Sequence, residues 1–299
     1  MSKKEFFWLD LQRTFALEIG EELSQQFVDS LFSGCKGRPR TADSIYFSIG
    51  LAWSALIVHW RNWILKKSLF KPPVLIMRDA KPLTVAPISD SWPRVWLNRK
   101  ICGIQDEISG DKESKIHPLL QEYLKQHSLK APFTFVDSGC WGTVVKELHE
   151  CIGIKFQPLF FFSHNPYIPG FLNELGVNPK YGEILNDSLE CCFPNITTRP
   201  SSLIRMDRGE IVPELQKTDF LSVLLGKSAL NGVYRGTGNE GKIFLNEFTM
   251  SPMDAVEHLI KLSDKAKGGE FTGILPYNSP TWSEGKRFLS DWPKELCWT

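Results

Sequence analysis

Two aspartates, Asp79 and Asp137, each follow an apolar run that has the length of a buried strand. Residues 74–77 (Val-Leu-Ile-Met) precede Arg78 and Asp79, and residues 133–136 (Phe-Thr-Phe-Val) precede Asp137. In an open α/β sheet, ligands bind in the crevice outside the carboxyl ends of the parallel strands. A carboxylate at that edge can bind Mg²⁺, attack a phosphorus atom or act as a base. The pattern therefore predicts a phosphate-handling or metal-handling site, with Asp79 and Asp137 as its acids.

Small and hydroxyl-bearing residues follow the second aspartate, in the segment 137–143 (Asp-Ser-Gly-Cys-Trp-Gly-Thr). Glycines let the backbone approach an anion closely, and a helix that begins near Thr143 would attract the anion through its N-terminus. We therefore expect Asp137 to be a Mg²⁺ ligand. The residues expected to hold the phosphate are Ser138, Gly139, Gly142 and Thr143. The alternative is a plain strand-to-helix turn in which Asp137 is the N-cap.

Basic and amide side chains occur near the same predicted strand ends. Arg78 stands beside Asp79, and Asn98 and Arg99 follow another short apolar run, residues 95–97. Guanidinium groups pair well with phosphate oxygens. We therefore predict that Arg78, Asn98 and Arg99 contribute to phosphate binding. An ordinary basic surface turn is the alternative for Asn98 and Arg99.

Short apolar runs alternate with helical patterns through the middle of the chain. The predicted strands are residues 74–77, 95–97, 133–136 and 154–162, and helices are predicted to begin near residues 118 and 143. Strands and helices that alternate at this spacing favour βαβ units. We therefore predict an α/β fold with a parallel, Rossmann-like sheet. His164 follows the last predicted strand; we interpret it as a solvated loop histidine, with acid–base chemistry as the alternative.

The two ends of the chain differ from this middle part. Apolar residues recur at helical spacing up to about residue 33, and a second helix is expected to end near residue 69, before Pro72. Beyond the middle part the pattern is mixed, apart from a helix that Ser251 should cap. We therefore divide the chain into an α-helical N-terminal segment, an α/β core that holds the site, and a mixed C-terminal extension. Their predicted bounds are residues 1–70, 71–195 and 196–299.

Composition and charge exclude several classes of protein. The chain has 35 basic and 34 acidic residues and a net charge of +1, so no nucleic acid is expected as a partner. Its seven cysteines include no Cys-x-x-Cys pair, which argues against a zinc ribbon. The apolar run at residues 6–9 is too short for the core of a signal peptide. We therefore expect reduced thiols and a cytoplasmic location.

One segment, residues 45–60, has no formally charged side chain apart from a protonated His59. A membrane-spanning helix needs about 20 apolar residues, and Arg61 interrupts this shorter run. We therefore interpret the segment as a buried core helix or as a homo-oligomer interface, with Arg61 and Lys66 at its solvated end. No membrane association is expected.

Three of these segments together resemble a pattern found in relatives of the haloacid-dehalogenase-like (HAD-like) phosphohydrolases. The pattern is Arg-Asp-small after a strand, a polar residue and Arg after the next, and then Val-Asp-x-Gly-x-x-Gly-[Ser/Thr]. Here it reads Arg78-Asp79-Ala80, Asn98-Arg99 and residues 136–143. The resemblance covers about residues 72–165. It implies that Asp79 is a nucleophile that forms an aspartyl phosphate, that Mg²⁺ is bound by Asp79 and Asp137, and that the substrate is a small phosphorylated molecule.

The chain departs from the family pattern at several positions. Lys81 stands where a second acid normally protonates the leaving group, and Asn98 stands where Ser or Thr normally ends the second strand. The last motif of the family normally supplies two acids for Mg²⁺, and Asp137 is the one that this chain clearly has. Lys115 or Lys130 could serve as the lysine that normally precedes this motif. These departures leave open a non-catalytic binding or interaction protein on the same scaffold.

A weaker resemblance is to phosphoribosyltransferases of the type I fold. Their phosphate loop follows a strand and ends in Thr, as residues 136–143 do here, although this chain has one acid where those enzymes have two. The separation of Asp79 from Asp137 along the sequence also suits that fold. A phosphoribosyltransferase-like enzyme is therefore kept as an alternative to the phosphohydrolase.

Overall fold

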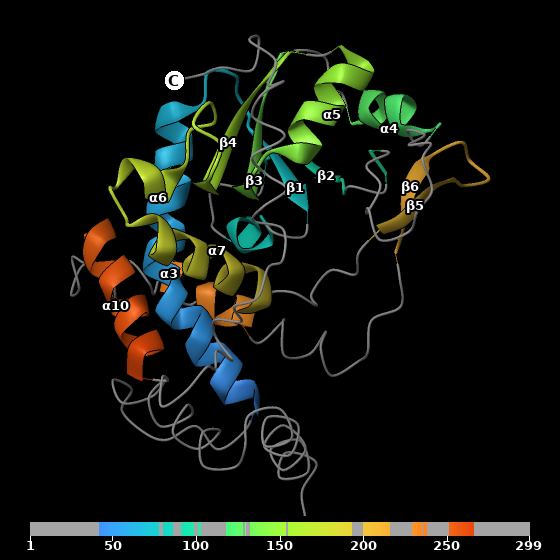
Figure 1. Cartoon of the computed structure of the whole chain (residues 1–299). Helices are drawn as coiled ribbons and strands as arrows, with labels where there is room; N and C mark the ends of the chain where they lie inside the picture. Colours follow the sequence, from blue (N-terminus) through green and yellow to red (C-terminus); the bar gives the residue numbers. More distant parts are fainter. Residues whose placement is uncertain are drawn as a thin grey trace, which may run out of the picture.

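The computed structural model describes the central part of the chain and several flanking segments. These are residues 42–77, 80–85, 91–98, 101–102, 118–127, 129, 132–153, 155–192, 200–215, 229–234, 236–237 and 251–265. Four strands form one parallel sheet in the order β2-β1-β3-β4 (Figure 1). Their bounds are β1 (Val74–Met77), β2 (Arg94–Trp96), β3 (Phe133–Cys140) and β4 (Phe156–Ser163). The predicted α/β fold with a parallel, Rossmann-like sheet is confirmed.

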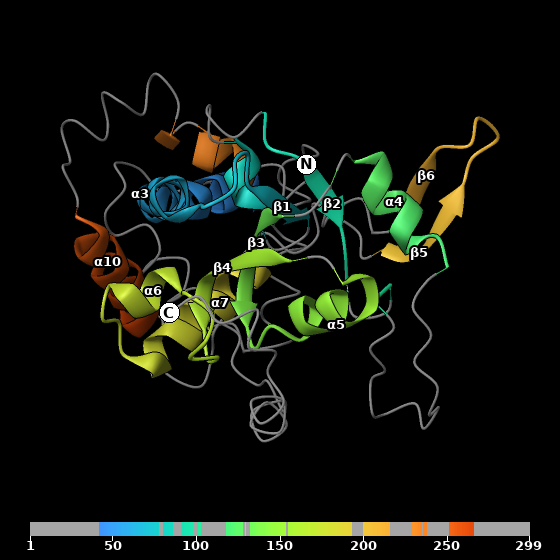
Figure 2. The same ribbon diagram turned by 90° about the horizontal axis from the view of Figure 1, so that it is seen from above.

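Helices cover both faces of this sheet (Figure 2). On one face, α3 (Ala42–Lys67), α7 (Pro179–Cys192) and α10 (Pro252–Lys265) share a core with the strands; on the other, α4 (Leu120–Gln126) and α5 (Thr143–Ile152) pack against them. Leu75 and Val136 belong to the first core, and Ile76 and Phe135 to the second. Successive side chains of a strand point to opposite faces, so both faces must be covered for such apolar strands to be stable.

The apolar helix α3 lies in the first core. Trp53, Trp60 and Ile64 are buried, and the rings of Trp60 and Phe161 meet edge to face with centroids 5.0 Å apart. The prediction that residues 45–60 form a covered helix is confirmed for the part of the helix whose burial is described. Within the described segments, no helix is both long and apolar enough to cross a bilayer. The helix predicted for the first 33 residues lies outside the described residues.

The edge strand β4 is buried along its whole length. Pro158, which cannot donate a ladder hydrogen bond, stands in this edge strand, where its missing N–H is tolerated. The chain then returns along the same edge, because the N–H of Phe160 donates to the carbonyl of Pro169 at 3.0 Å. This return covers part of the open edge and leads into the short helix α6 (Phe171–Glu174).

The described C-terminal part mixes a hairpin with a helix, as predicted. Strands β5 (Pro200–Arg205) and β6 (Ile211–Leu215) pair in antiparallel fashion beside α4. The last described helix, α10, begins with a capping box: the N–H of Asp254 donates to Ser251 Oγ, and the N–H of Ser251 donates to Asp254 Oδ2, both at 3.1 Å. The predicted Ser251 cap is therefore confirmed.

Candidate functional site

The two strands that precede Asp79 and Asp137 in the sequence are neighbours. β1 and β3 are parallel and pair Val74 with Phe135 and Leu75 with Val136. Because the two strands are adjacent and parallel, their carboxyl ends point to one edge of the sheet. Asp79 and its neighbour Arg78 lie outside the described residues, as does Arg99. The predicted approach of Asp79 to Asp137 thus stays a prediction.

The sequence predicted that Asp137 follows the end of β3. In the structure Asp137 stands inside the strand instead. The strand continues to Cys140, and its apolar start at Phe133 and Phe135 faces the core of α4 and α5. Strand alternation puts the half-buried Asp137 on that same face. Its Oδ1 accepts a hydrogen bond from the N–H of Ser138 at 2.9 Å. The carboxylate is therefore held close to its own backbone, near the open end of the sheet.

The alternative in which Asp137 caps the following helix is wrong. The N-cap of α5 is Gly142, with φ of 81° and no side-chain hydrogen bond to the helix start. Thr143 is the first helical residue, as the sequence predicted. Gly142 has no side chain that could bond the first N–H groups of the helix. This property suits the predicted anion site, although phosphate binding by Gly142 and Thr143 stays a prediction.

Ser138 and Gly139 have packing roles that the sequence did not reveal. Ser138 is fully buried within β3. Gly139 has φ of 128°, and a Cβ atom there would overlap the carbonyl oxygen of Phe162 on β4. Glycine is therefore required here by the contact between two strands, whatever else the segment binds.

Asn98 follows β2 and closes a turn. Its Oδ1 accepts a hydrogen bond from the N–H of Ile101 at 2.8 Å, and its carbonyl oxygen accepts one from the N–H of Cys102 at 3.1 Å. The turn begins at the carboxyl end of an edge strand, next to β1. Asn98 thus has a structural role at the predicted edge, and its contact with phosphate stays a prediction.

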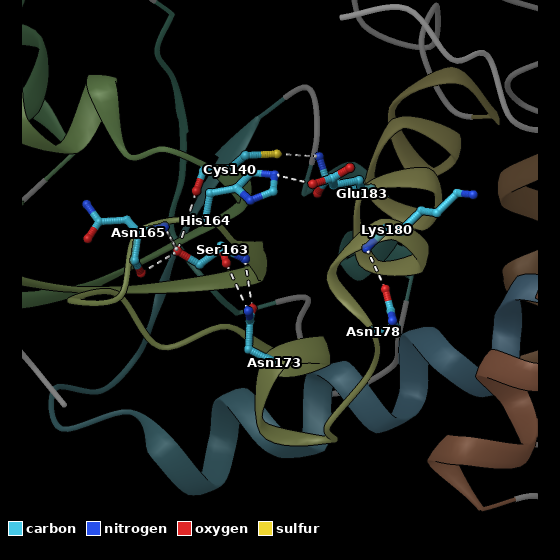
Figure 3. Close-up of polar contacts among 9 residues, drawn as sticks. Cys140, Ser163, His164, Asn165, Asn173, Asn178, Lys180 and Glu183 are labelled. Atoms are coloured by element: carbon cyan, nitrogen blue, oxygen red, sulfur yellow. Dashed lines mark hydrogen bonds and ion pairs between the residues drawn. The ribbon is translucent and has the colours of Figure 1, made fainter. Parts of the chain in front are cut away.

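A second group of polar side chains, which the sequence analysis did not bring together, lies between β3, β4 and α7 (Figure 3). His164 Nε2 lies 3.1 Å from Glu183 Oε1, and the Nδ2 of Asn186 donates a hydrogen bond to Cys140 Sγ at 3.2 Å. We call these four residues the Cys140 cluster. Its members come from two strand ends and one helix, so only the fold assembles them.

The imidazole of His164 is enclosed by aromatic rings. Trp141 stacks on it with centroids 4.8 Å apart, and Phe162 meets it edge to face at 4.7 Å. The side chain of His164 is 12% exposed, so its interpretation as a solvated loop residue is wrong. Burial lowers the pKa of His164 to about 4, whereas the carboxylate of Glu183 favours the charged imidazole and opposes this effect. At neutral pH the ring is therefore uncharged.

A network of side-chain hydrogen bonds fixes the loop that carries His164. Asn173 accepts from the N–H of Ser163 and donates to its carbonyl oxygen, both at 2.9 Å. Asn165 donates through Nδ2 to the carbonyl oxygen of Trp141 at 3.2 Å, which ties this loop to the segment after β3. These bonds fix the backbone on both sides of His164 (Figure 3).

A pocket of about 660 Å³ opens beside the same loop. Its wall contains His164, the apolar side chains of Leu159 and Phe162, and Lys67, whose ammonium group pairs with Glu174 at 2.8 Å. The pocket lining therefore mixes apolar side chains with polar and charged ones, among them His164.

The sequence gives a signal for the strand-end members of the Cys140 cluster but none for its members on α7. His164 follows the apolar run 159–162 after one residue, at a place where polar residues of a parallel sheet gather, whereas Cys140 lies four positions after the run 133–136. Glu183 and Asn186 lie in a stretch whose polar residues have no partner that spacing alone could identify.

Comparison of the sequence with models of known protein families, and with curated proteins, finds no match. Within the described segments, which exclude Asp79, no three or more His, Cys, Asp or Glu side chains are placed to hold a metal ion.

Proposed function

We propose that this protein binds a small phosphorylated compound at the carboxyl edge of its parallel sheet and hydrolyses it with the help of Mg²⁺. The observation that supports this most is the direct, parallel pairing of β1 with β3. Asp79 follows β1 by two residues in the sequence, and Asp137 stands near the end of β3. Ligands bind at the carboxyl ends of parallel strands, and Mg²⁺ is commonly held there by one or two carboxylates together with substrate phosphates.

The surroundings of Asp137 support the phosphate part of the proposal. The start of α5 has no side-chain cap, and its dipole favours an anion there. In this proposal Asp79 is the nucleophile, Asp79 and Asp137 hold Mg²⁺, and Arg78 and Arg99 contact the phosphate. Mg²⁺ would neutralise the developing charge on the phosphoryl oxygens.

A screen of phosphomonoesters with the full chain tests the proposal, with and without MgCl₂. We expect Mg²⁺-dependent release of inorganic phosphate by the wild type, and a loss on the order of 10³-fold in Asp79→Asn, because a nucleophile is removed. Asp207→Asn is the matched control: Asp207 is exposed in the turn between β5 and β6. This variant should retain wild-type turnover.

Two outcomes would contradict the proposed hydrolase activity. One is release of phosphate at equal rates by Asp79→Asn and the wild type. The other is no release from any phosphomonoester. In that second case, release of pyrophosphate from phosphoribosyl pyrophosphate would identify the transferase instead, and Mg²⁺-dependent binding of a phosphomonoester without turnover would identify a binding protein.

A further inference from the structure

The pocket of about 660 Å³ is bounded by the end of α3, the edge strand β4 and the short helix α6. Lys67 is the last residue of α3 and Glu174 is the last residue of α6, and both line the pocket. Their side chains form an ion pair, with 2.8 Å between Nζ and Oε1, and are 40% and 38% exposed. Because the pair lines the pocket and is this exposed, both charges are accessible to a molecule that enters it.

The other polar side chains of the lining are already used within the protein. The pocket has three carboxamides in its wall, those of Gln157, Asn165 and Asn173. Each of them accepts a backbone N–H through its oxygen and donates to a backbone carbonyl through its nitrogen. His164, the remaining titratable group of the lining, is uncharged at neutral pH. Recognition of a charged molecule therefore falls to Lys67 and Glu174.

The ion pair has hydrogen-bonding capacity to spare. An ammonium group has three donors, and a carboxylate has about four acceptor positions. The Oε1 atom of Glu174 faces Lys67, and its Oε2 accepts a hydrogen bond from Trp63 Nε1 at 3.0 Å, which fixes the carboxylate beside α3. Within the described part of the chain, these contacts leave donors on Lys67 and acceptor positions on Glu174 that a ligand can use.

A molecule that carries a carboxylate beside an ammonium group complements such a pair. Its carboxylate accepts from Lys67 and its ammonium group donates to Glu174, so that opposite charges alternate around the four groups. In an α-amino acid both groups are bonded to one carbon atom, which holds them about as close together as Lys67 Nζ and Glu174 Oε1. Hydrogen bonds between ionised groups are stronger than those between neutral ones. A ligand with one charge would use only one member of the pair.

Proline rings form another part of the pocket wall. Pro166, Pro169 and Pro179 line the pocket, and Pro166 and Pro179 are exposed. A proline ring presents apolar surface and has no N–H to donate. This part of the wall therefore suits an apolar side chain better than a charged one.

We propose that this pocket binds a free α-amino acid with an apolar side chain, whose carboxylate and ammonium group are recognised by Lys67 and Glu174. The site goes beyond the proposed phosphate chemistry and does not depend on it. The pocket lies along β4 at one edge of the sheet, whereas the phosphate site is predicted at the ends of β1 and β3.

Isothermal titration calorimetry of the full-length chain with L-leucine and L-phenylalanine tests the proposal. The titrations are made at neutral pH with EDTA present, which separates this site from the Mg²⁺-dependent one. We expect one amino acid to bind per chain. N-acetyl-L-phenylalanine lacks the ammonium group and L-phenylalaninamide lacks the carboxylate. Each should bind about tenfold more weakly than L-phenylalanine or worse, because one charge-assisted contact is lost.

Variants of the ion pair give a readout that a purely structural role would not produce. Lys67→Met should weaken binding of L-phenylalanine and remove the preference over L-phenylalaninamide, since the lysine recognises the carboxylate. Glu174→Gln should weaken binding and remove the preference over N-acetyl-L-phenylalanine. Lys66→Met and Glu122→Gln are the controls: Lys66 is the exposed neighbour of Lys67, and Glu122 belongs to another exposed ion pair, with Arg205. Both controls should bind L-phenylalanine as the wild type does.

Three results would overturn the proposal. The first is that neither amino acid binds to the wild type. The second is that N-acetyl-L-phenylalanine or L-phenylalaninamide binds to the wild type as tightly as L-phenylalanine does. The third is wild-type affinity in Lys67→Met or Glu174→Gln, with circular dichroism showing that the variant is folded. If a variant does not fold, the comparison of the three ligands on the wild type decides.

Discussion

The imidazole of His164 lies with Nε2 3.1 Å from Glu183 Oε1, in a contact that joins the end of β4 to α7. Both side chains are largely buried, at 12% and 13% exposed. A second contact, between Cys140 and Asn186, lies one turn further along α7. Together the two contacts dock the helix on the carboxyl edge of the sheet, so these side chains serve the packing of α7.

Burial of His164 makes stability depend on pH. Its pKa falls from 6.5 to about 4 on folding, so the unfolded chain binds more protons between these values. Stability from this group is complete above pH 6.5 and decreases as the pH falls toward 4; at pH 4.5 it is lower by about 2.5 kcal/mol. Urea unfolding at pH 7.5 and 4.5 measures the difference, which should be smaller by that amount in His164→Gln. An unchanged difference in His164→Gln would contradict the assignment.

Gly139 is predicted to be the least replaceable glycine of the segment that follows Asp137. In Gly139→Ala the new methyl group would meet the carbonyl oxygen of Phe162 at a φ of 128°, so we expect a loss of at least about 3 kcal/mol. Gly209→Ala is the control, because Gly209 also has a positive φ, 82°, but its Cβ would enter open space. That control should cost only about 1–2 kcal/mol. Urea unfolding compares them, and equal losses would show that the contact with β4 is unimportant.

Gln157 ties the end of α3 to the sheet. It is buried; its Oε1 accepts from the N–H of Leu69 at 2.9 Å, and its Nε2 donates to the carbonyl oxygen of Lys67 at 3.1 Å. Gln157→Leu leaves these backbone groups without the side chain, and we expect it to reduce the free energy of unfolding by about 2–4 kcal/mol. Gln126→Leu removes two similar bonds to Ile211, but the Gln126 side chain is itself exposed. Chemical denaturation should show the smaller loss for Gln126→Leu.

The fold was largely predictable because its signals are local. Apolar runs of strand length, such as the one before Asp137, alternate with helical patterns, and these produced the parallel sheet and the covered helix at residues 45–60. The end of β3 was misjudged because polar Asp137 and Ser138 look like the start of a loop. In the structure β3 continues to Cys140, pairing with β4 along this stretch. Pairing with a neighbouring strand is a tertiary contact that no local pattern contains.

The Cys140 cluster was not predictable for a related reason. Cys140 and Asn186 are 46 positions apart, and the docking of α7 alone brings them together. His164 was noticed at a strand end but was interpreted as solvated, because its enclosure by Trp141 and Phe162 depends on the loop geometry after β3 and β4. Sequence thus identified the edge of the sheet where polar groups gather, but not which of them meet.

Binding of Mg²⁺ and phosphate should stabilise the chain through Asp137. A ligand present at 100 times its dissociation constant raises the free energy of unfolding by about 2.7 kcal/mol when it binds only the folded state. We therefore expect MgCl₂ with a phosphomonoester to raise the melting temperature of the wild type, measured by differential scanning calorimetry. Asp137→Asn should abolish this rise, because it removes the carboxylate charge that attracts the cation while leaving the size of the side chain unchanged. Asp207→Asn should retain it. An equal rise in all three proteins would place the bound ligand elsewhere and exclude Asp137 from the site.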